Sequence, residues 1–363
     1  MHSAIRFLMG SMLGLMLLGS MACGGGEEEM ARDIQAKPYA ALPANANYLY
    51  GLRPKIIASN ALVDELRKAM GKQHDDLLFT SKAREVGLDP QQQIDAMVYG
   101  LYGGSWAMVA LGQFEEPAVI KAISAQGEGR IQIQVTEKNY AGHKYYVINR
   151  SAEGASDSLY VCFPATGRML AASNENLMMN SIVVSRGKAD SMLSDKTLGP
   201  LLQKIDPAAA GWVAGLSQGT LDRSTLSVRF SQESLGNGVH NYYGQLNLTP
   251  QLIAFNGQFE CDNAEKANRQ AENFAAVQAA FARNYFQIFG KGVIDFSNKV
   301  QIKPEQNLIK VSVELKPEDV DTIAQDTAAA LKSGGGLPRE IMDQLQGSAS
   351  EPSTQPATSQ SAE

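Results

Sequence analysis

The stretch MVYGLYGGSWAMVALGQF, residues 97–114, decides the fold expected of this chain. Apolar and aromatic residues at 97–102 and at 106–114 are typical of two β-strands. Gly103 and Gly104 lie between them and supply the positive φ angles that a tight two-residue turn requires. The stretch therefore predicts an antiparallel hairpin in the first half of the chain.

Helices and further strands are predicted on both sides of this hairpin. Asn60 is expected to cap a helix whose apolar face carries Leu62, Val63 and Leu66. Apolar spacing also predicts helices that begin at Pro117 and Ser173, and at 264–289 and 317–331. Strand patterns occur at 48–52, 131–135, 145–148, 159–163, 169–172, 212–215, 300–302 and 309–315. The pattern predicts an α+β fold with antiparallel sheets flanked by helices.

A four-residue sequence occurs twice and suggests a duplication. Gly-Gln-Phe-Glu stands at 112–115 and again at 257–260, and Lys-Ala follows each copy at the same distance. A strand pair and a helix after the first copy also have a counterpart after the second. We therefore predict two tandem related modules, residues 40–195 and 196–335, with Phe114 and Phe259 at equivalent buried positions. A chance match of four residues remains the alternative.

The N-terminus has the composition of an export signal. Arg6 and the amino terminus precede an apolar run that ends at residue 22, which is too short and too rich in glycine to span a bilayer. We expect residues 1–22 to be a signal peptide. Ala22 precedes Cys23, and three glycines and three glutamates follow, so residues 23–39 are predicted to be a flexible stalk. At the other end, residues 336–363 are predicted to be a disordered tail because they are rich in Ser, Thr, Pro and Gln.

The junction at Cys23 resembles the lipobox of bacterial lipoproteins. That resemblance implies that the Cys23 thiol is acylated and anchors the chain to a membrane. By the same resemblance, Gly24 after the cysteine implies delivery to the outer membrane. The chain departs from the family at Ser20, where leucine is usual, so a freely secreted protein remains the alternative.

Charge and cysteine content exclude some functions and leave others open. The formal charge is −6, and no cluster of Lys and Arg occurs, which argues against a nucleic-acid partner. Besides Cys23 the chain holds Cys162 and Cys261. They are a candidate disulfide in an oxidising compartment, or two small core residues.

Residues with catalytic or metal-binding chemistry are sparse. Gly215-Leu216-Ser217-Gln218-Gly219 has the spacing of a serine nucleophile turn, but the loop after it and the isolated His240 do not suit a hydrolase. No metal or cofactor is predicted, because the four histidines are isolated from one another. The strand tyrosines could line a groove for a ligand or partner, or pack within a sheet: Tyr140, Tyr145, Tyr146, Tyr242 and Tyr243.

Short motifs at 42–44, 87–90 and 112–114 resemble those of duplicated, exported bacterial proteins with domains of unknown function. The resemblance covers about residues 40–335 and implies no catalytic residue. We expect a non-catalytic cell-envelope lipoprotein that binds or scaffolds, with the membrane and an envelope protein as partners. The alternative is a periplasmic carrier or chaperone for an apolar ligand, and the third is a serine hydrolase that uses Ser217.

Overall fold

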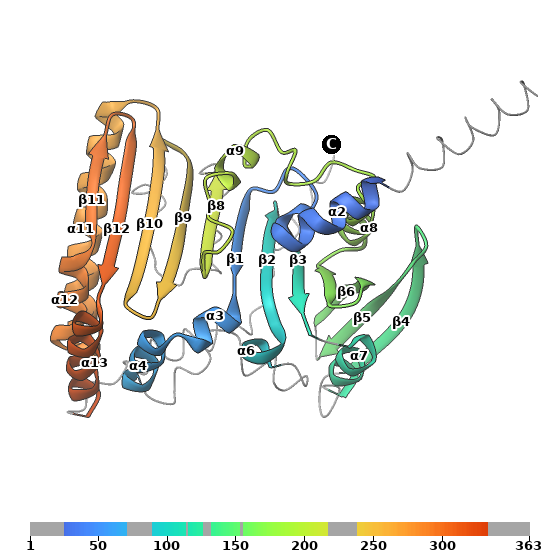
Figure 1. Ribbon diagram of the computed structural model, residues 1–363, viewed down its shortest axis with the longest axis horizontal. Helices are drawn as coiled ribbons and strands as arrows, with labels where there is room; N and C mark the ends of the chain where they lie inside the picture. The colour runs from blue at the N-terminus through green and yellow to red at the C-terminus, as the bar shows by residue number, and fades with distance from the viewer. Residues whose placement is uncertain are drawn as a thin grey trace, which may run out of the picture.

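The computed structural model describes residues 25–70, 89–113, 115–125, 132–152, 155–216 and 238–332. The first part of this chain forms a mixture of short helices and hairpins (Figure 1). Its elements are α2 (Gly25–Ala36), the 3-10 helix η1 (Pro38–Ala41), β1 (Tyr48–Leu52), α3 (Pro54–Ser59), α4 (Ala61–Met70), α6 (Pro90–Gln93), β2 (Ile94–Tyr102), β3 (Ser105–Gly112), α7 (Glu116–Ala125), β4 (Gln132–Tyr140), β5 (His143–Ala152), β6 (Ala155–Ala165), β7 (Arg168–Ala172) and α8 (Glu175–Ser185).

The second part has fewer strands and longer helices. Its elements are α9 (Gly199–Leu202), β8 (Gly211–Leu216), β9 (Val239–Thr249), β10 (Leu252–Cys261), α11 (Ala264–Phe289), α12 (Lys291–Lys299), β11 (Gln301–Glu305), β12 (Leu308–Leu315) and α13 (Pro317–Lys332). No helix of the described residues is both long and apolar enough to cross a bilayer.

All the strands named above belong to one twelve-stranded sheet, and every neighbouring pair is antiparallel. The strand order is β11-β12-β10-β9-β8-β1-β2-β3-β7-β6-β5-β4, and Figure 1 shows it running from one end of the molecule to the other. The predicted α+β class with antiparallel pairing and flanking helices is confirmed. The predicted hairpin is β2–β3, with Gly103 at a φ of 64° in its turn.

The division into two modules is not confirmed, because the sheet runs through both halves. β1 pairs with β8 along its whole length, from Tyr48 opposite Gly215 to Leu52 opposite Gly211. In addition, α4 packs on α13, and the apolar face of α4 shares a core cluster with Val320. A helix from the first predicted module thus packs on a helix from the second, so the two predicted modules share a core.

The order of strands is nevertheless the same in each half when it is followed outward from the centre. It reads β1-β2-β3-β7-β6 on one side and β8-β9-β10-β12-β11 on the other, and the β4–β5 hairpin is added beyond β6. A shared order is what a duplication would leave, and the duplication itself stays a prediction.

The two copies of Gly-Gln-Phe-Glu lie differently in their strands. β3 ends at Gly112, the first residue of its copy, and Phe114 lies outside the described residues. β10 continues through its copy to Cys261, so Phe259 lies within the strand instead of at its end. Phe259 is half-buried against Tyr242 and Phe274, with ring centroids 5.8 and 4.9 Å apart. The full burial expected of Phe259 was wrong, because its partners are themselves partly exposed rings.

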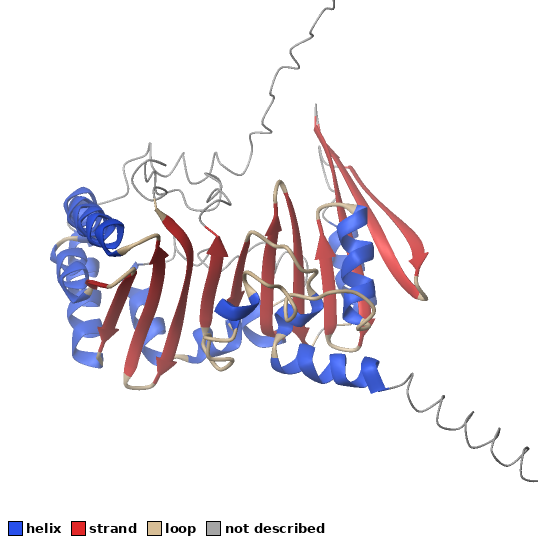
Figure 2. Ribbon diagram, turned by 90° about the horizontal axis from the view of Figure 1, so that it is seen from above, coloured by secondary structure: helices blue, strands red, loops and turns tan. Residues whose placement is uncertain are grey.

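Helices cover both faces of the sheet (Figure 2). On one face α2, η1 and α8 enclose the largest cluster of buried side chains, which includes Ile34, Leu49, Leu170 and Met178. On the other face α7 covers one end of the sheet, while α4, α11 and α13 cover the opposite end. Strand alternation explains the two cores, because consecutive residues of a strand point to opposite faces.

Local hydrogen bonds fix where the helices begin. The side chains of Asn60, Asn174 and Asn263 accept backbone N–H groups at the starts of α4, α8 and α11. The predicted cap Ser173 lies one residue too early, because its hydroxyl instead accepts the N–H of Trp106 at 2.8 Å. Glu175 is the first residue of α8, and its carboxylate accepts hydrogen bonds from Lys138 Nζ at 2.7 Å and from Tyr145 Oη at 2.6 Å.

Candidate functional site

Two of the residues predicted from sequence, Cys23 and Ser217, lie outside the described residues. Strand β8 ends at Leu216, directly before the serine. The structure therefore neither places a nucleophile nor supplies the triad geometry that hydrolysis by Ser217 would need. The tail predicted at 336–363 and the signal at 1–22 also lie outside.

The candidate disulfide is not formed, because Cys162 and Cys261 are both free, buried thiols. Cys162 lies on β6 and Cys261 on β10, with six strands between them in the sheet. Strands lie about 4.8 Å apart, so seven steps separate the two by about 34 Å. A disulfide requires Cα atoms within about 7 Å. Both cysteines are therefore core residues, which was the other prediction.

The two described histidines lie far apart in the sheet, on different strands. His240 on β9 pairs with Asp262, and His143 begins β5. No group of three or more His, Cys, Asp or Glu side chains within the described ranges could hold a metal ion.

The predicted flexible stalk is wrong over most of its length, because residues 25–36 form the helix α2. Ile34 is completely buried and Met30 packs against the same core cluster. These two residues are four apart and share one side of the helix, so their burial docks α2 on the sheet. The 3-10 helix η1 that follows is buried at all four positions.

An ion pair near the start of α2 adds to this docking. The Glu27 carboxylate lies 3.0 Å from Arg186 Nη2 and 3.4 Å from Lys188 Nζ. The hydrogen bond from Arg186 and its charge lower the pKa of Glu27, and Lys188 lowers it further. Arg186 follows the last residue of α8, so the pair ties the start of α2 to the end of α8.

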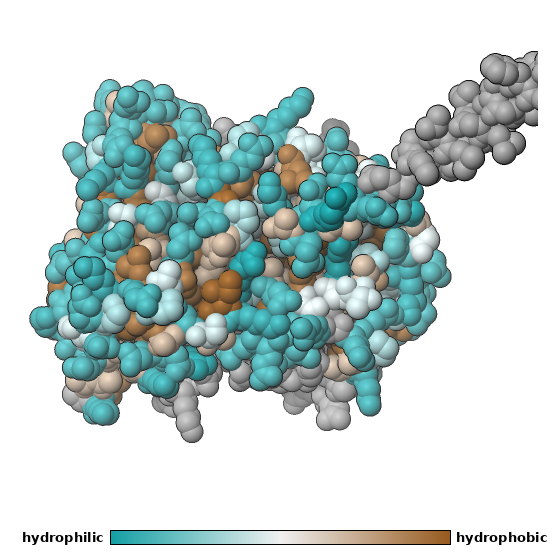
Figure 3. Space-filling view, in the orientation of Figure 1, coloured by the Kyte–Doolittle hydropathy of each residue, from teal (hydrophilic) through white to brown (hydrophobic). Residues whose placement is uncertain are grey.

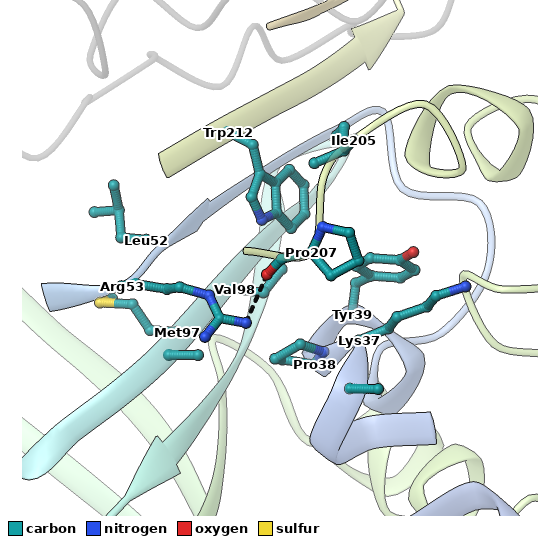
Figure 4. Close-up of a pocket in the computed structure, with 12 residues that line it drawn as sticks. Lys37, Pro38, Tyr39, Leu52, Arg53, Met97, Val98, Ile205, Pro207 and Trp212 are labelled. Atoms are coloured by element: carbon teal, nitrogen blue, oxygen red, sulfur yellow. Dashed lines mark hydrogen bonds between the residues drawn. The ribbon is translucent and has the colours of Figure 1, made fainter. Parts of the chain in front are cut away.

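A small hollow lies between η1, β1, β2 and Trp212 (Figure 4). Its volume is about 20 Å³, which is room for about one water molecule. Arg53 donates a hydrogen bond to the Pro207 carbonyl at 2.6 Å beside it, and Tyr39 meets Trp212 edge to face at 5.7 Å. The hollow is too small for an organic ligand, so these residues serve packing.

A larger, open groove of about 400 Å³ lies beside α2. Turns of the sheet line it on one side, and α2 and the end of α8 line it on the other. The lining side chains are mainly polar or small: Glu27, Ala31, Ala141, Gly142, His143, Pro164, Ala165, Arg168, Ser185 and Arg186. Figure 3, in the orientation of Figure 1, shows a mainly hydrophilic surface around the start of α2.

Arg168 is the unusual side chain of this groove. Its Nε is shut off from solvent and has no hydrogen-bond partner among the described residues. Burial lowers the pKa of its guanidinium. A buried donor without a partner costs about 1–3 kcal/mol, and more when it is charged. Sequence reasoning missed Arg168, because a single arginine after a turn glycine carries no motif.

His143 lies on the same groove, and its surroundings lower its pKa. Burial lowers its pKa, and the charge of Arg186 lowers it further, while Glu27 acts in the opposite direction. Together with Arg168 and Arg186 it forms a group of cationic or potentially cationic side chains around one carboxylate.

A row of aromatic rings crosses the face of the sheet opposite α2. From α11 to β3 each ring centroid lies between 4.9 and 6.4 Å from the next. Its members are Phe274, Phe259, Tyr242, Tyr48, Tyr50, Tyr99 and Trp106. Of the tyrosines predicted as a set, only Tyr242 belongs to this row. Tyr145 packs in the core on the α2 face, and Tyr146 in the cluster under α7, so the predicted set does not form one groove.

Comparison with known proteins gives a distant likeness of shape. No family model matches the chain, and no curated protein matches it significantly. Crystal form I of TP0453 aligns with 13% identity over 81% of this chain and 97% of that chain, with a TM-score of 0.44. Crystal form III of TP0453 aligns with 12% identity over 79% and 97%, with a TM-score of 0.47. No function follows from a likeness of this degree.

Proposed function

We propose that the chain is a lipid-anchored cell-envelope protein that binds or scaffolds other molecules at a membrane surface and carries out no catalysis. The lipid is attached to Cys23, and the outer membrane is the proposed location because Gly24 follows the cysteine.

The observation that carries this proposal is the position of α2. The helix begins at Gly25, two residues after Cys23, and Ile34 docks it in the core. A chain spans at most about 3.6 Å per residue, so the anchor lies within about 7 Å of the folded body. A flexible stalk of residues 23–39 would instead have held the body about 20–25 Å away on average. The anchored protein is therefore held directly against the membrane.

The carrier function is less well supported. A small-molecule site is a mostly apolar pocket of about 300–1,000 Å³. The hollow under Trp212 measures about 20 Å³, and the larger groove is open and lined by charged groups. Neither one suits an apolar ligand. The hydrolase alternative would be revived by an activity-based phosphonate that labels the chain and fails to label Ser217→Ala.

Metabolic labelling with an alkyne fatty acid tests the anchor. The full chain should carry the label and stay with membranes after a carbonate wash, whereas Cys23→Ser should lose both properties. Cys261→Ala is the matched control, because it removes a buried thiol and should leave the label in place. Labelling of Cys23→Ser, or its retention on washed membranes, would overturn the proposal.

A further inference from the structure

The groove beside α2 has an excess of positive charge that its own carboxylate does not neutralise. Arg186 directs Nε and Nη2 to Glu27, at 3.1 and 3.0 Å, and Nη1 to the Ala141 carbonyl. Lys188 reaches the same carboxylate. Glu27 is thus already shared by two cations, and no ion pair joins it or any other described carboxylate to Arg168.

Strand geometry sets the direction of the Arg168 side chain. Along β7, Leu170 and Ala172 belong to the core on the α2 face, whereas Met169 and Ala171 belong to the core under α7. Arg168 is two residues from Leu170 and four from Ala172, so its side chain lies on the same face of the strand as theirs. This is the α2 face, where Arg168 lines the groove. Its Nε is closed off from water and has no acceptor among the described residues, while the side chain as a whole is partly exposed in the groove and open to an anion there.

Phosphate is the anion that fits this arrangement. Guanidinium groups bind phosphate oxygens through paired, charge-assisted hydrogen bonds, and a second cation on the rim strengthens such a site. The groove volume of about 400 Å³ exceeds what a single phosphate group occupies, so it has room for the polar part of a larger molecule.

We propose that this groove binds the phosphate group of an anionic phospholipid headgroup, which has no cation of its own to neutralise it, with Arg168 as the main ligand and Arg186 on its rim. The lipid source rests on the proposed anchor. Glu27 follows Cys23 by four residues, and α2 rises about 1.5 Å per residue from Gly25, so the groove opens within about 10 Å of the lipidated cysteine.

Vesicle flotation with an unlipidated chain tests the groove separately from the anchor. The chain begins at residue 23 with Cys23→Ser and keeps every described residue. Vesicles of phosphatidylcholine are compared with vesicles that also contain phosphatidylglycerol, and inorganic phosphate is titrated separately by calorimetry. The chain should float with the phosphatidylglycerol vesicles, and Arg168→Gln should weaken this binding about tenfold or more.

Arg150→Gln is the charge-matched control, because Arg150 on β5 pairs with Asp157 on β6 and does not line the groove. It should bind as the parent chain does. If Arg168→Gln fails to fold, as judged by circular dichroism, Arg186→Gln removes the rim cation and should also weaken binding.

Equal binding by the parent chain, Arg168→Gln and Arg150→Gln would overturn the site. Binding of inorganic phosphate that depends on Arg168, without binding of vesicles, would overturn the lipid source. If the full chain takes up no fatty-acid label at Cys23 but the unlipidated chain still binds vesicles, the proposed anchor is refuted and the proposed binding site in the groove is supported.

Discussion

Replacing Ile34 with alanine should release α2 from the folded body. Ile34 has no exposed surface, and among residues 27–36 of the helix, whose burial is described, it is the only buried side chain. A helix of twelve residues is marginal by itself in water, so α2 depends on this contact to stay folded. We therefore expect Ile34→Ala to open α2 while the sheet remains intact.

The size of the effect follows from the burial. Removing three carbons from a completely buried isoleucine costs about 2–5 kcal/mol, which includes the cavity left behind. Since each 1.4 kcal/mol is a factor of ten in an equilibrium constant, the open form of α2 should become about 30-fold more populated, or more.

Amide hydrogen exchange measures this population directly. The amides of α2 should lose protection by at least the same factor in Ile34→Ala, and those of β1 and β2 should change little. Glu29→Ala is the control on the same helix, because that side chain is exposed. If α2 exchanges equally slowly in all three chains, the helix is not held by Ile34, and the short distance proposed between a lipid on Cys23 and the folded body fails with it.

Three further outcomes are expected. Gly51→Ala should lower the free energy of unfolding by about 1–3 kcal/mol, measured by chemical denaturation, because a methyl group there would overlap the Trp212 ring. Hydrogen bonds from Lys138 and Tyr145 lower the pKa of Glu175, so its contribution to stability is complete above pH 4.5 and is lost as the pH falls through the lowered value. In an acid titration of the free energy of unfolding, Glu175→Gln should therefore lose less stability than the parent chain. Burial raises the pKa of Cys162 to about 12, so a thiol reagent at pH 8 should label it only after denaturation, and labelling of the folded chain would contradict its burial.

Elements set by local sequence could be predicted well. The hairpin around Gly103 and the long helix α11 lie where the patterns placed them, because turn glycines and apolar spacing act over a few residues. The signal for α2 was also present, since Glu27 and Glu28 lie in its first turn and Met30 and Ile34 are four residues apart. The three glycines at 24–26, two of which lie inside α2, led to the prediction of a stalk instead.

Pairings between distant segments could not be read from the sequence. Nothing in Tyr48–Leu52 identifies β8 as its second neighbour, because an antiparallel strand with two apolar faces accepts many partners. The groove beside α2 could not be predicted for the same reason. Glu27 on α2 and Arg168 on β7 line one groove only through the tertiary fold, in which α2 packs on α8, and neither residue has a motif of its own.

The open ends of the sheet bear on how the protein behaves when many copies are close together. β11 is an end strand, and it carries Lys303, Pro304 and Glu305 exposed along its length. Proline has no N–H to offer a neighbouring strand, and flanking charges would lose water if another chain docked there. Edge-to-edge polymerisation through this strand is thereby disfavoured. Replacing Pro304 with valine would restore a donor and, by the same reasoning, make β11 a template for aggregation.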